Sequence, residues 1–187
     1  MNLGEVRTGE RGSYNVLTEL PRNCKELPGG PPDWEPEHWA VLEVLIKNNG
    51  YNYACNIRTD TFAQPRDGMP PPIRETNSCD EMRDNLEGKD GLTYIGKNRD
   101  DWRQCGPECH PVALFVKRGP DPDLWDFHFF RLDSDGTWSH KPGYTFPTKL
   151  GEDGRIIHNP IDSGWLGYEF YGYYCVCKCR VHLEPDK

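Results

Sequence analysis

Eight cysteines in a chain of 187 residues constrain the fold more than any other feature of this sequence. They are Cys24, Cys55, Cys79, Cys105, Cys109, Cys175, Cys177 and Cys179. An even number of cysteines in a small polar domain is typical of a disulfide framework formed in an oxidising compartment. We therefore expect a secreted, extracellular protein in which most cysteines are paired. The first residues carry no apolar signal-peptide core, so we predict that no signal peptide is present in this chain.

The last three cysteines alternate along one segment, so on a β-strand their side chains would share one face. We expect each of Cys175, Cys177 and Cys179 to bond to a distant partner. The alternative is a zinc site that combines them with Cys105 and Cys109. Zinc sites usually take paired cysteines from tight turns, whereas alternate residues of a strand lie about 6.5–7 Å apart. Disulfides are therefore favoured, and we predict neither a metal nor a cofactor.

Composition argues against two classes of partner. A formal net charge of -8 makes this an acidic protein, whereas nucleic acid is bound by a basic surface. No stretch approaches the ~20 apolar residues of a membrane span. Hydrophobic residues make up only 35% of the chain but aromatic residues 12%, which predicts a small, aromatic-rich core. The 19 glycines and 17 prolines favour long ordered loops.

The pattern of apolar residues divides the chain into an arm and one domain. Residues 1–35 are polar and end in a cluster of prolines and glycines, which predicts an extended N-terminal arm. Residues 36–187 form the domain. Its first part carries three helical patterns, over residues 36–46, 51–57 and 79–90. The second of these follows asparagines that can serve as its N-cap.

The second half of the chain changes to strand patterns. Residues 112–116 form a short apolar run, and residues 168–181 are a last strand candidate. Between them, residues 124–132 and 137–140 flank Asp133-Ser134-Asp135-Gly136, a strong hairpin signal. Helices followed by antiparallel strands predict an α+β fold, with the N-terminal helices packed on an antiparallel sheet.

Two histidines lie on the strands of this hairpin. Folding the chain about residues 134–135 puts His128 nearly opposite Lys141, and one residue of loop asymmetry sets His128 beside His140. A histidine that is oriented by a polar ring on the neighbouring strand provides the base and the orienting group of a nucleophilic triad. Two histidines hydrogen-bonded at a sheet face are the purely structural alternative.

The segments that carry these histidines belong to a wider resemblance. It rests on the surroundings of His128 and on three strings, Asn48-Asn49-Gly50-Tyr51-Asn52-Tyr53-Ala54, Thr61-Phe62-Ala63-Gln64-Pro65 and Trp138-Ser139-His140-Lys141-Pro142-Gly143. Together they resemble a bacterial group related to NlpC-type papain-like cell-wall amidases, discontinuously over residues 48–145. The resemblance implies a papain-like fold in which His128 is the base and His140 the orienting residue for a cysteine at a helix N-terminus.

The chain departs from this family at the nucleophile. Gly50 stands where the family places the cysteine, and glycine has no side chain with which to form a covalent acyl intermediate. Cys55 is the obvious substitute, but five residues along a helix turn the side chain by about 140° and advance it by ~7.5 Å. Cys55 would therefore point away from His128, and we expect it to form a disulfide instead.

Two functions are consistent with these observations. The first is a non-catalytic extracellular domain, a pseudoenzyme that binds a glycan, a peptide or an extracellular protein, or that serves as a structural component. The second is a cysteine hydrolase of peptide or peptidoglycan amide bonds that uses Cys55 with His128 and His140. We favour the first. It predicts that a thiol-directed electrophile labels no cysteine of the native protein, and that Gly50→Cys creates a reactive thiol.

Overall fold

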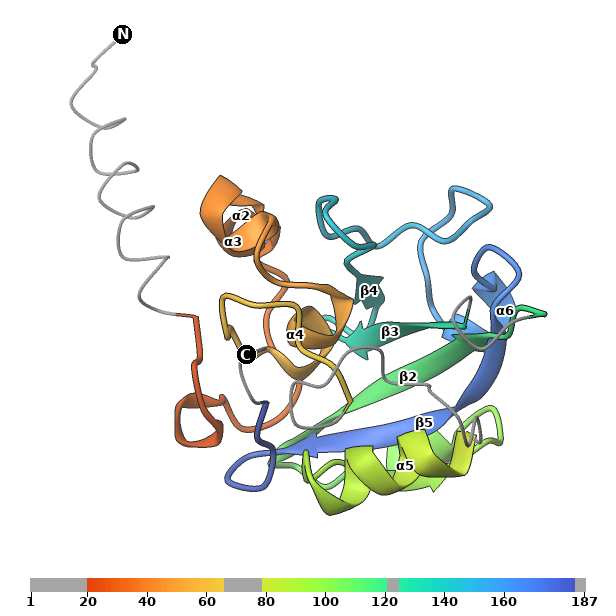
Figure 1. Ribbon diagram of the computed structural model, residues 1–187, viewed down its shortest axis with the longest axis horizontal. Coiled ribbons are helices and arrows are strands. Elements are labelled where there is room, and N and C mark those ends of the chain that lie inside the picture. Colours follow the sequence, from red (N-terminus) through yellow and green to blue (C-terminus); the bar gives the residue numbers. More distant parts are fainter. Residues whose placement is uncertain (1–19, 66–78, 121–124, 184–187) are drawn as a thin grey trace, which may run out of the picture.

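The protein is a mixed α+β structure built around one antiparallel sheet (Figure 1). The computed structural model describes residues 20–65, 79–120 and 125–183, and it describes only the backbone of Cys24 and of residues 79–81. The sheet has five strands in the order β1-β5-β2-β3-β4, and every neighbouring pair is antiparallel. The strands are β1 (Thr93–Gly96), β2 (Cys109–Lys117), β3 (Asp126–Leu132), β4 (Trp138–His140) and β5 (Glu169–Cys177). The predicted α+β class is confirmed.

Strand β2 lies at the centre of the sheet, between β5 and β3. Residues 112–116 are all buried, as expected for a continuous apolar run that is covered on both faces. The predicted strand is confirmed and extends further at both ends than the apolar run itself.

Strands β3 and β4 form the predicted hairpin. The backbone N–H of Asp133 donates to the carbonyl of Thr137, and the N–H of Thr137 donates to the Asp135 carboxylate. Gly136 has a φ of 83°, which glycine adopts without steric cost. The turn sequence therefore fixes where the two strands meet.

The first predicted helix is split into two. Helix α2 (Pro36–Ala40) and helix α3 (Leu42–Leu45) are separated by Val41, whose ψ of 127° is extended. Val41 packs against the small apolar cluster that contains Trp39 and Tyr53. This packing favours the break at Val41. The apolar pattern alone had indicated one continuous helix.

Helix α4 (Gly50–Cys55) confirms the second predicted helix. Its N-cap is Asn49, whose side-chain oxygen accepts hydrogen bonds from the backbone N–H groups of Tyr51 and Asn52. The Asn52 side chain accepts from the Asn49 N–H in return, so the end of the helix is capped reciprocally. Helix α5 (Cys79–Gly88) confirms the third.

Four short elements were not predicted. They are β1, η1 (Cys24–Glu26), η2 (Asp101–Gln104) and α6 (Pro160–Ser163). Each has at most four residues, too few to show a period of 2 or 3.6 in the sequence. Strand β1 forms because β5 offers it an antiparallel partner, which is a tertiary cause.

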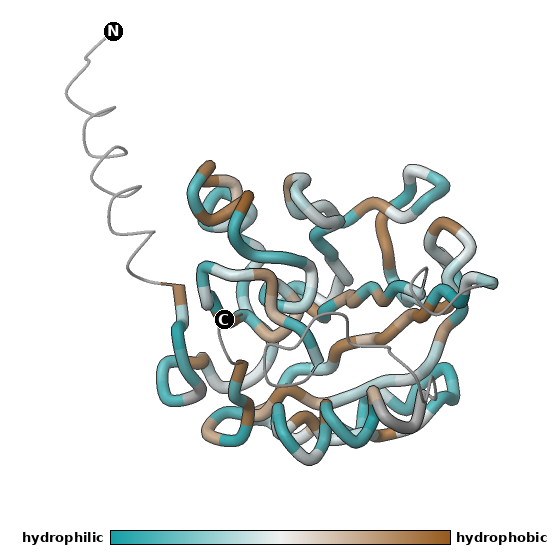
Figure 2. Tube along the Cα trace, in the orientation of Figure 1, coloured by the Kyte–Doolittle hydropathy of each residue, from teal (hydrophilic) through white to brown (hydrophobic). Residues whose placement is uncertain are grey.

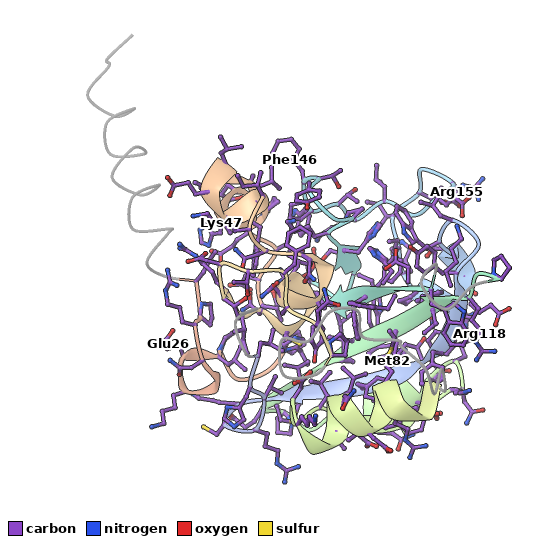
Figure 3. All side chains as sticks on the ribbon, viewed as in Figure 1. Glu26, Lys47, Met82, Arg118, Phe146 and Arg155 are labelled. Atoms are coloured by element: carbon purple, nitrogen blue, oxygen red, sulfur yellow. A yellow bond between two sulfur atoms is a disulfide. The ribbon has the colours of Figure 1, made fainter. Side chains whose placement is uncertain are left out.

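Both faces of the sheet are covered by apolar side chains. The cluster beneath α4 and α5 includes Tyr51, Met82, Leu86, Val112 and Phe129. The cluster on the opposite face includes Ala113, Phe115, Phe130, Trp138 and Tyr173. Figure 2 shows the apolar segments along the central strands, and Figure 3 shows Met82 of α5 beside the sheet. The aromatic-rich core that the composition predicted is confirmed.

Two disulfides join β5 to the segment before and at the start of β2. Cys105 is bonded to Cys175 and Cys109 to Cys177, so these four sulfurs cannot be zinc ligands. Cys179 is free and exposed, so the prediction that all three alternating cysteines are bonded is wrong. Strand β5 ends at Cys177, and Cys179 lies beyond it with a left-handed φ of 66°. No group of three potential metal ligands occurs within the described ranges.

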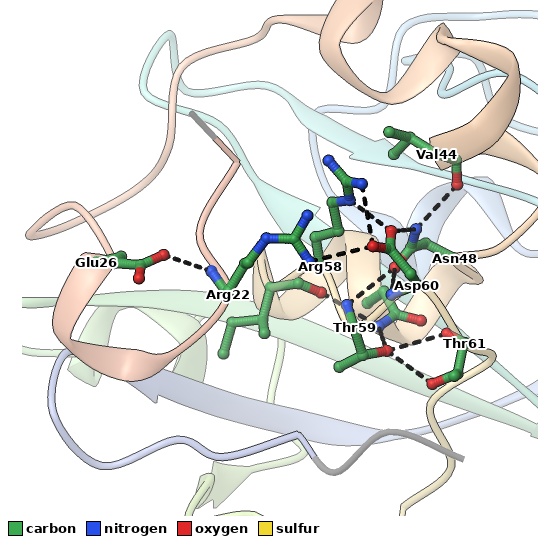
Figure 4. A network of polar contacts seen from close by, with 10 residues as sticks. Arg22, Glu26, Val44, Asn48, Arg58, Thr59, Asp60 and Thr61 are labelled. Carbon is green, nitrogen blue, oxygen red and sulfur yellow. Dashed lines mark hydrogen bonds and ion pairs between the residues drawn. The ribbon is translucent and has the colours of Figure 1, made fainter. Parts of the chain in front are cut away.

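A polar network fixes the chain on either side of α4 (Figure 4). The side-chain oxygen of Asn48 accepts hydrogen bonds from the backbone N–H groups of Thr59 and Asp60 at 3.0 Å each. The Asp60 carboxylate also pairs with Arg22 and Arg58. Burial raises the pKa of Asp60, but these hydrogen bonds outweigh it and lower the pKa to about 2. The network therefore stays ionised at neutral pH.

The predicted N-terminal arm is tied to the domain along the part that the structure describes. Leu20 and Leu27 are buried, and the carbonyl of Pro32 accepts a hydrogen bond from the backbone N–H of Ser134. Residues 20–35 therefore pack on the domain. Residues 1–19, the rest of the predicted arm, lie outside the described residues.

Candidate functional site

The hairpin brings the two predicted histidines into contact. His128 Nε2 lies 2.8 Å from His140 Nδ1. The strand register differs from the predicted one, because His140 pairs with Phe130 instead of standing opposite His128. Residues two apart on a strand share a face, so the two rings meet diagonally across the strands. Their predicted proximity is confirmed; their catalytic roles stay predictions.

The hydrogen bonds of this histidine pair have a fixed direction. His140 Nε2 lies 2.9 Å from the carbonyl oxygen of Leu150, which can only accept, so this nitrogen carries the proton. In the neutral ring Nδ1 of His140 is then an acceptor, and His128 must donate to it from Nε2. The proton of His128 is thus on Nε2, and its Nδ1 carries a lone pair.

Both histidines are neutral at physiological pH. Burial lowers the pKa of His140 to about 4. The hydrogen bond to the Leu150 carbonyl raises this pKa, but by less than burial lowers it. Burial and the neighbouring His140 hold the pKa of His128 well below its ordinary value. His128 also stacks on Trp165, with ring centroids 5.1 Å apart and an interplanar angle of 17°. The pair is therefore a packed, uncharged unit.

Gly50, the position that the resemblance assigns to the nucleophile, faces His128. It is the first residue of α4, and a Cβ built on it would lie 3.8 Å from His128 Cε1. The same Cβ would lie only 2.7 Å from the backbone carbonyl oxygen of Lys141, a distance that real Cβ atoms essentially never show. No residue other than glycine fits here unless the backbone moves. The predicted rescue by Gly50→Cys therefore carries a steric cost that the sequence did not reveal.

Lys141 holds this carbonyl in place. Its side chain is buried, and Nζ donates to the three backbone carbonyls of Leu45, Asn48 and Gly143. Burial lowers the pKa of Lys141 to about 8. Sequence reasoning assigned Lys141 no role, although it stands directly after His140. It ties the end of α3, the approach to α4 and the loop after β4 together.

Cys55 lies on the other side of α4, in the core. Its side chain is buried in the cluster beneath α4 and α5, and it does not line the cavity beside His128. Burial and the nearby Asp90 carboxylate raise the pKa of the Cys55 thiol well above its ordinary value. A hydrogen bond with Tyr51 lowers this pKa, but by less. Cys55 is also free, so the predicted disulfide is wrong, whereas the predicted orientation away from His128 fits the structure. A buried thiol of raised pKa is a poor nucleophile, which disfavours the hydrolase that would use it.

A cavity of about 480 Å³ opens beside the histidine pair. Its walls are predominantly aromatic and come from α4, β3 and the loops around them. The lining includes Asn49, Gly50, Phe62, Gln64, Trp125, Asp126, His128, Trp165 and Tyr168. Sequence reasoning found Gly50 and His128 but not the aromatic walls, because those residues are scattered along the chain.

These features define a disulfide-bonded α+β domain with a neutral histidine pair, beside which the described residues place no cysteine. Insoluble matrix shell protein 1 of Ruditapes philippinarum is 37% identical to this chain over 143 residues, which cover 72% of this chain and 88% of that protein. The chain belongs to the family of that protein. Isoamylase 2, chloroplastic, of Arabidopsis thaliana is 30% identical over 87 residues, which are 41% of this chain and only 10% of that protein.

No family model matches the chain, and no solved structure gives a significant match. Along the part of the chain that the structure describes, no helix is both long enough and apolar enough to cross a membrane.

Proposed function

We propose that this chain is a secreted, non-catalytic structural component of an extracellular matrix. The observation that carries the proposal is the relationship to insoluble matrix shell protein 1, because the alignment spans 88% of that protein. A match over nearly the whole relative favours a shared role for the whole domain. Its partners would then be extracellular proteins, glycans or peptides of the matrix.

The covalent structure supports an extracellular location. The two disulfides join segments that are 70 and 68 residues apart in the sequence, and such bonds persist in oxidising compartments. The chain relies on them because its apolar fraction is small. They also suit a protein that must remain folded outside the cell.

The site supports the absence of thiol catalysis. The residue that faces His128 is Gly50, and the Lys141 carbonyl fills the space that a nucleophile's Cβ would need. His128 and His140 still form a hydrogen-bonded pair, but no cysteine among the described residues lines the adjoining cavity.

The proposal includes descent from a papain-like, NlpC-like amidase. Three placements support it: the start of α4 faces His128, His128 lies on a strand, and His140 orients it from the next strand. This is the arrangement of nucleophile position, base and orienting residue that the family resemblance implies. In this chain the nucleophile position is Gly50, which has no side chain.

Two measurements test the proposal on the disulfide-bonded protein. Antibodies against the chain should label the extracellular matrix of the source organism, and the protein should remain in the residue after aqueous extraction. The purified chain should not cleave peptide or peptidoglycan amide bonds. An intracellular location would contradict the structural role, and amide cleavage that disappears in His128→Ala would contradict the absence of catalysis.

A further inference from the structure

The cavity beside His128 has the size and composition of a ligand site. Its volume of about 480 Å³ lies within the range of about 300–1,000 Å³ that is typical of small-molecule pockets. Aromatic walls with a few placed polar groups are also typical of such sites. The loss of the nucleophile removes the chemistry from this cavity but leaves its walls in place.

The polar groups of the cavity have spare hydrogen-bond acceptors. His128 is only 7% exposed, and its Nδ1 has no hydrogen-bond partner among the described residues, yet this atom is not sealed off from the cavity. Because the bond to His140 fixes the proton on Nε2, Nδ1 can only accept. The side-chain oxygen of Gln64, also in the lining, is buried without a partner in the described structure. A ligand that matches this site supplies O–H or N–H donors.

Two other polar side chains of the lining, those of Asn49 and Asp126, are already engaged. The Asn49 side chain caps α4 and donates to the carbonyl of Ala63. The Asp126 carboxylate accepts from the Tyr168 hydroxyl. The described lining contains no lysine or arginine, so nothing in it would compensate an anionic ligand.

We propose that this cavity binds a neutral oligosaccharide, with a sugar ring against the aromatic walls and a hydroxyl or amide N–H donating to His128 Nδ1. Pyranose rings combine apolar C–H faces, which pack on aromatic side chains, with several hydroxyl donors. A peptide would bring charged termini and carbonyl groups that need donors, and the cavity offers few. The proposal concerns the ligand of the cavity and does not depend on the matrix role.

The test is a titration of the native, disulfide-bonded chain with three neutral tetramers. These are β-1,4-linked glucose, β-1,4-linked N-acetylglucosamine and α-1,4-linked glucose, followed by calorimetry and by tryptophan fluorescence. At least one should bind saturably and change the emission, because Trp125 and Trp165 line the cavity. The acetylated tetramer distinguishes an amide donor from a hydroxyl donor.

Variants locate the binding. Trp165→Ala and Phe62→Ala each remove part of a wall and should weaken binding at least about tenfold. Phe146→Ala is the matched control, since Phe146 is exposed at the surface and lies outside the lining (Figure 3); its affinity should be unchanged. If Trp165→Ala fails to fold, because its ring also packs on His128, the Phe62 variant still decides the question.

Nitrogen NMR of the imidazoles gives a readout that a merely structural effect would not produce. Binding should shift the unprotonated Nδ1 resonance of His128 and leave the resonances of the exposed His158 in place. Three results would overturn the proposal: no neutral tetramer binds, binding survives in both cavity variants, or only a peptide or a sulfated sugar binds. Cleavage of a bound tetramer would instead contradict the non-catalytic role and leave the binding site standing.

Discussion

The substitution Gly50→Ala measures how tightly the chain packs around Gly50, the position that the family resemblance assigns to the nucleophile. The added methyl group would lie 2.7 Å from the Lys141 carbonyl oxygen, whereas ordinary contacts of a Cβ begin at 3.4 Å. The start of α4 and the residue after β4 must therefore separate by several tenths of an ångström. That movement is resisted, because the Lys141 side chain is bonded to three other backbone carbonyls.

The expected effect is the balance of two terms. Overpacking of this kind costs about 1–3 kcal/mol. Alanine allows the unfolded chain fewer conformations than glycine does, and this offsets about 0.4–1 kcal/mol of the cost. We expect a net loss of about 1–2 kcal/mol, which lowers Tm by about 2–8 °C in a domain of this size. Thermal unfolding followed by circular dichroism measures the change.

Gly88→Ala is the matched control. Gly88 is the last residue of α5, and a Cβ built on it meets nothing within 4 Å. The same change of side chain should therefore be stabilising there, by about 0.4–1 kcal/mol. Opposite signs at the two glycines would support the close contact at Gly50. If Gly50→Ala also raised Tm, the contact with Lys141 would be refuted, and steric closure could not explain why position 50 is glycine.

Three further predictions concern buried and exposed groups. Burial lowers the pKa values of His110 and His140 to about 4, so between pH 6.5 and pH 4 the unfolded chain binds protons that the folded chain does not. The free energy of unfolding should therefore decrease as the pH is lowered from 6.5 to 4, by about 3 kcal/mol for each histidine. A urea midpoint that stays constant from pH 7 to pH 4.5 would contradict this. Of the two cysteines that the structure shows to be free, iodoacetamide should label Cys179 and not Cys55 in the native protein, and His128→Ala should not change the rate. Peptide mass mapping identifies the labelled sites, and labelling of Cys55 would contradict its burial. This replaces the expectation that no cysteine reacts. Lys141→Met should cost about 2–4 kcal/mol in urea unfolding, because the buried carbonyls of Leu45 and Asn48 and the part-buried carbonyl of Gly143 lose their donor. A variant as stable as the natural chain would show that these carbonyls find other partners.

Elements with strong local signals could be predicted from the sequence. The Asp-Ser-Asp-Gly turn located the hairpin, and the hairpin brought His128 and His140 together even though the assumed register was wrong. The two rings meet despite the wrong register, because both extend from the same face of the sheet and reach each other diagonally. The asparagine cap likewise located α4 within one residue of its start.

Features that depend on distant segments could not be predicted. The break at Val41 and the four-residue strand β1 arise from packing and pairing that no local pattern encodes. The same holds for the site: the family resemblance predicts that Gly50 occupies the nucleophile position, but only the fold shows how close the Lys141 carbonyl lies to it. The state of Cys55 also depended on its surroundings, because no other cysteine sulfur of the described side chains reaches the core where it lies.

The disulfide between Cys105 and Cys175 determines how this domain would respond to tension. A force applied at the two ends of the chain passes through this bond and bypasses the 70-residue separation between its cysteines. Roughly 240 Å of extended chain is thereby withheld from stretching. His128 and His140 lie inside the bypassed loop and Gly50 outside it, so a pull can peel α4 away while the histidine pair stays together. Under oxidising conditions the chain outside this loop could extend, but the loop itself would stay closed, so the disulfide sets a fixed limit on how far the domain can be stretched.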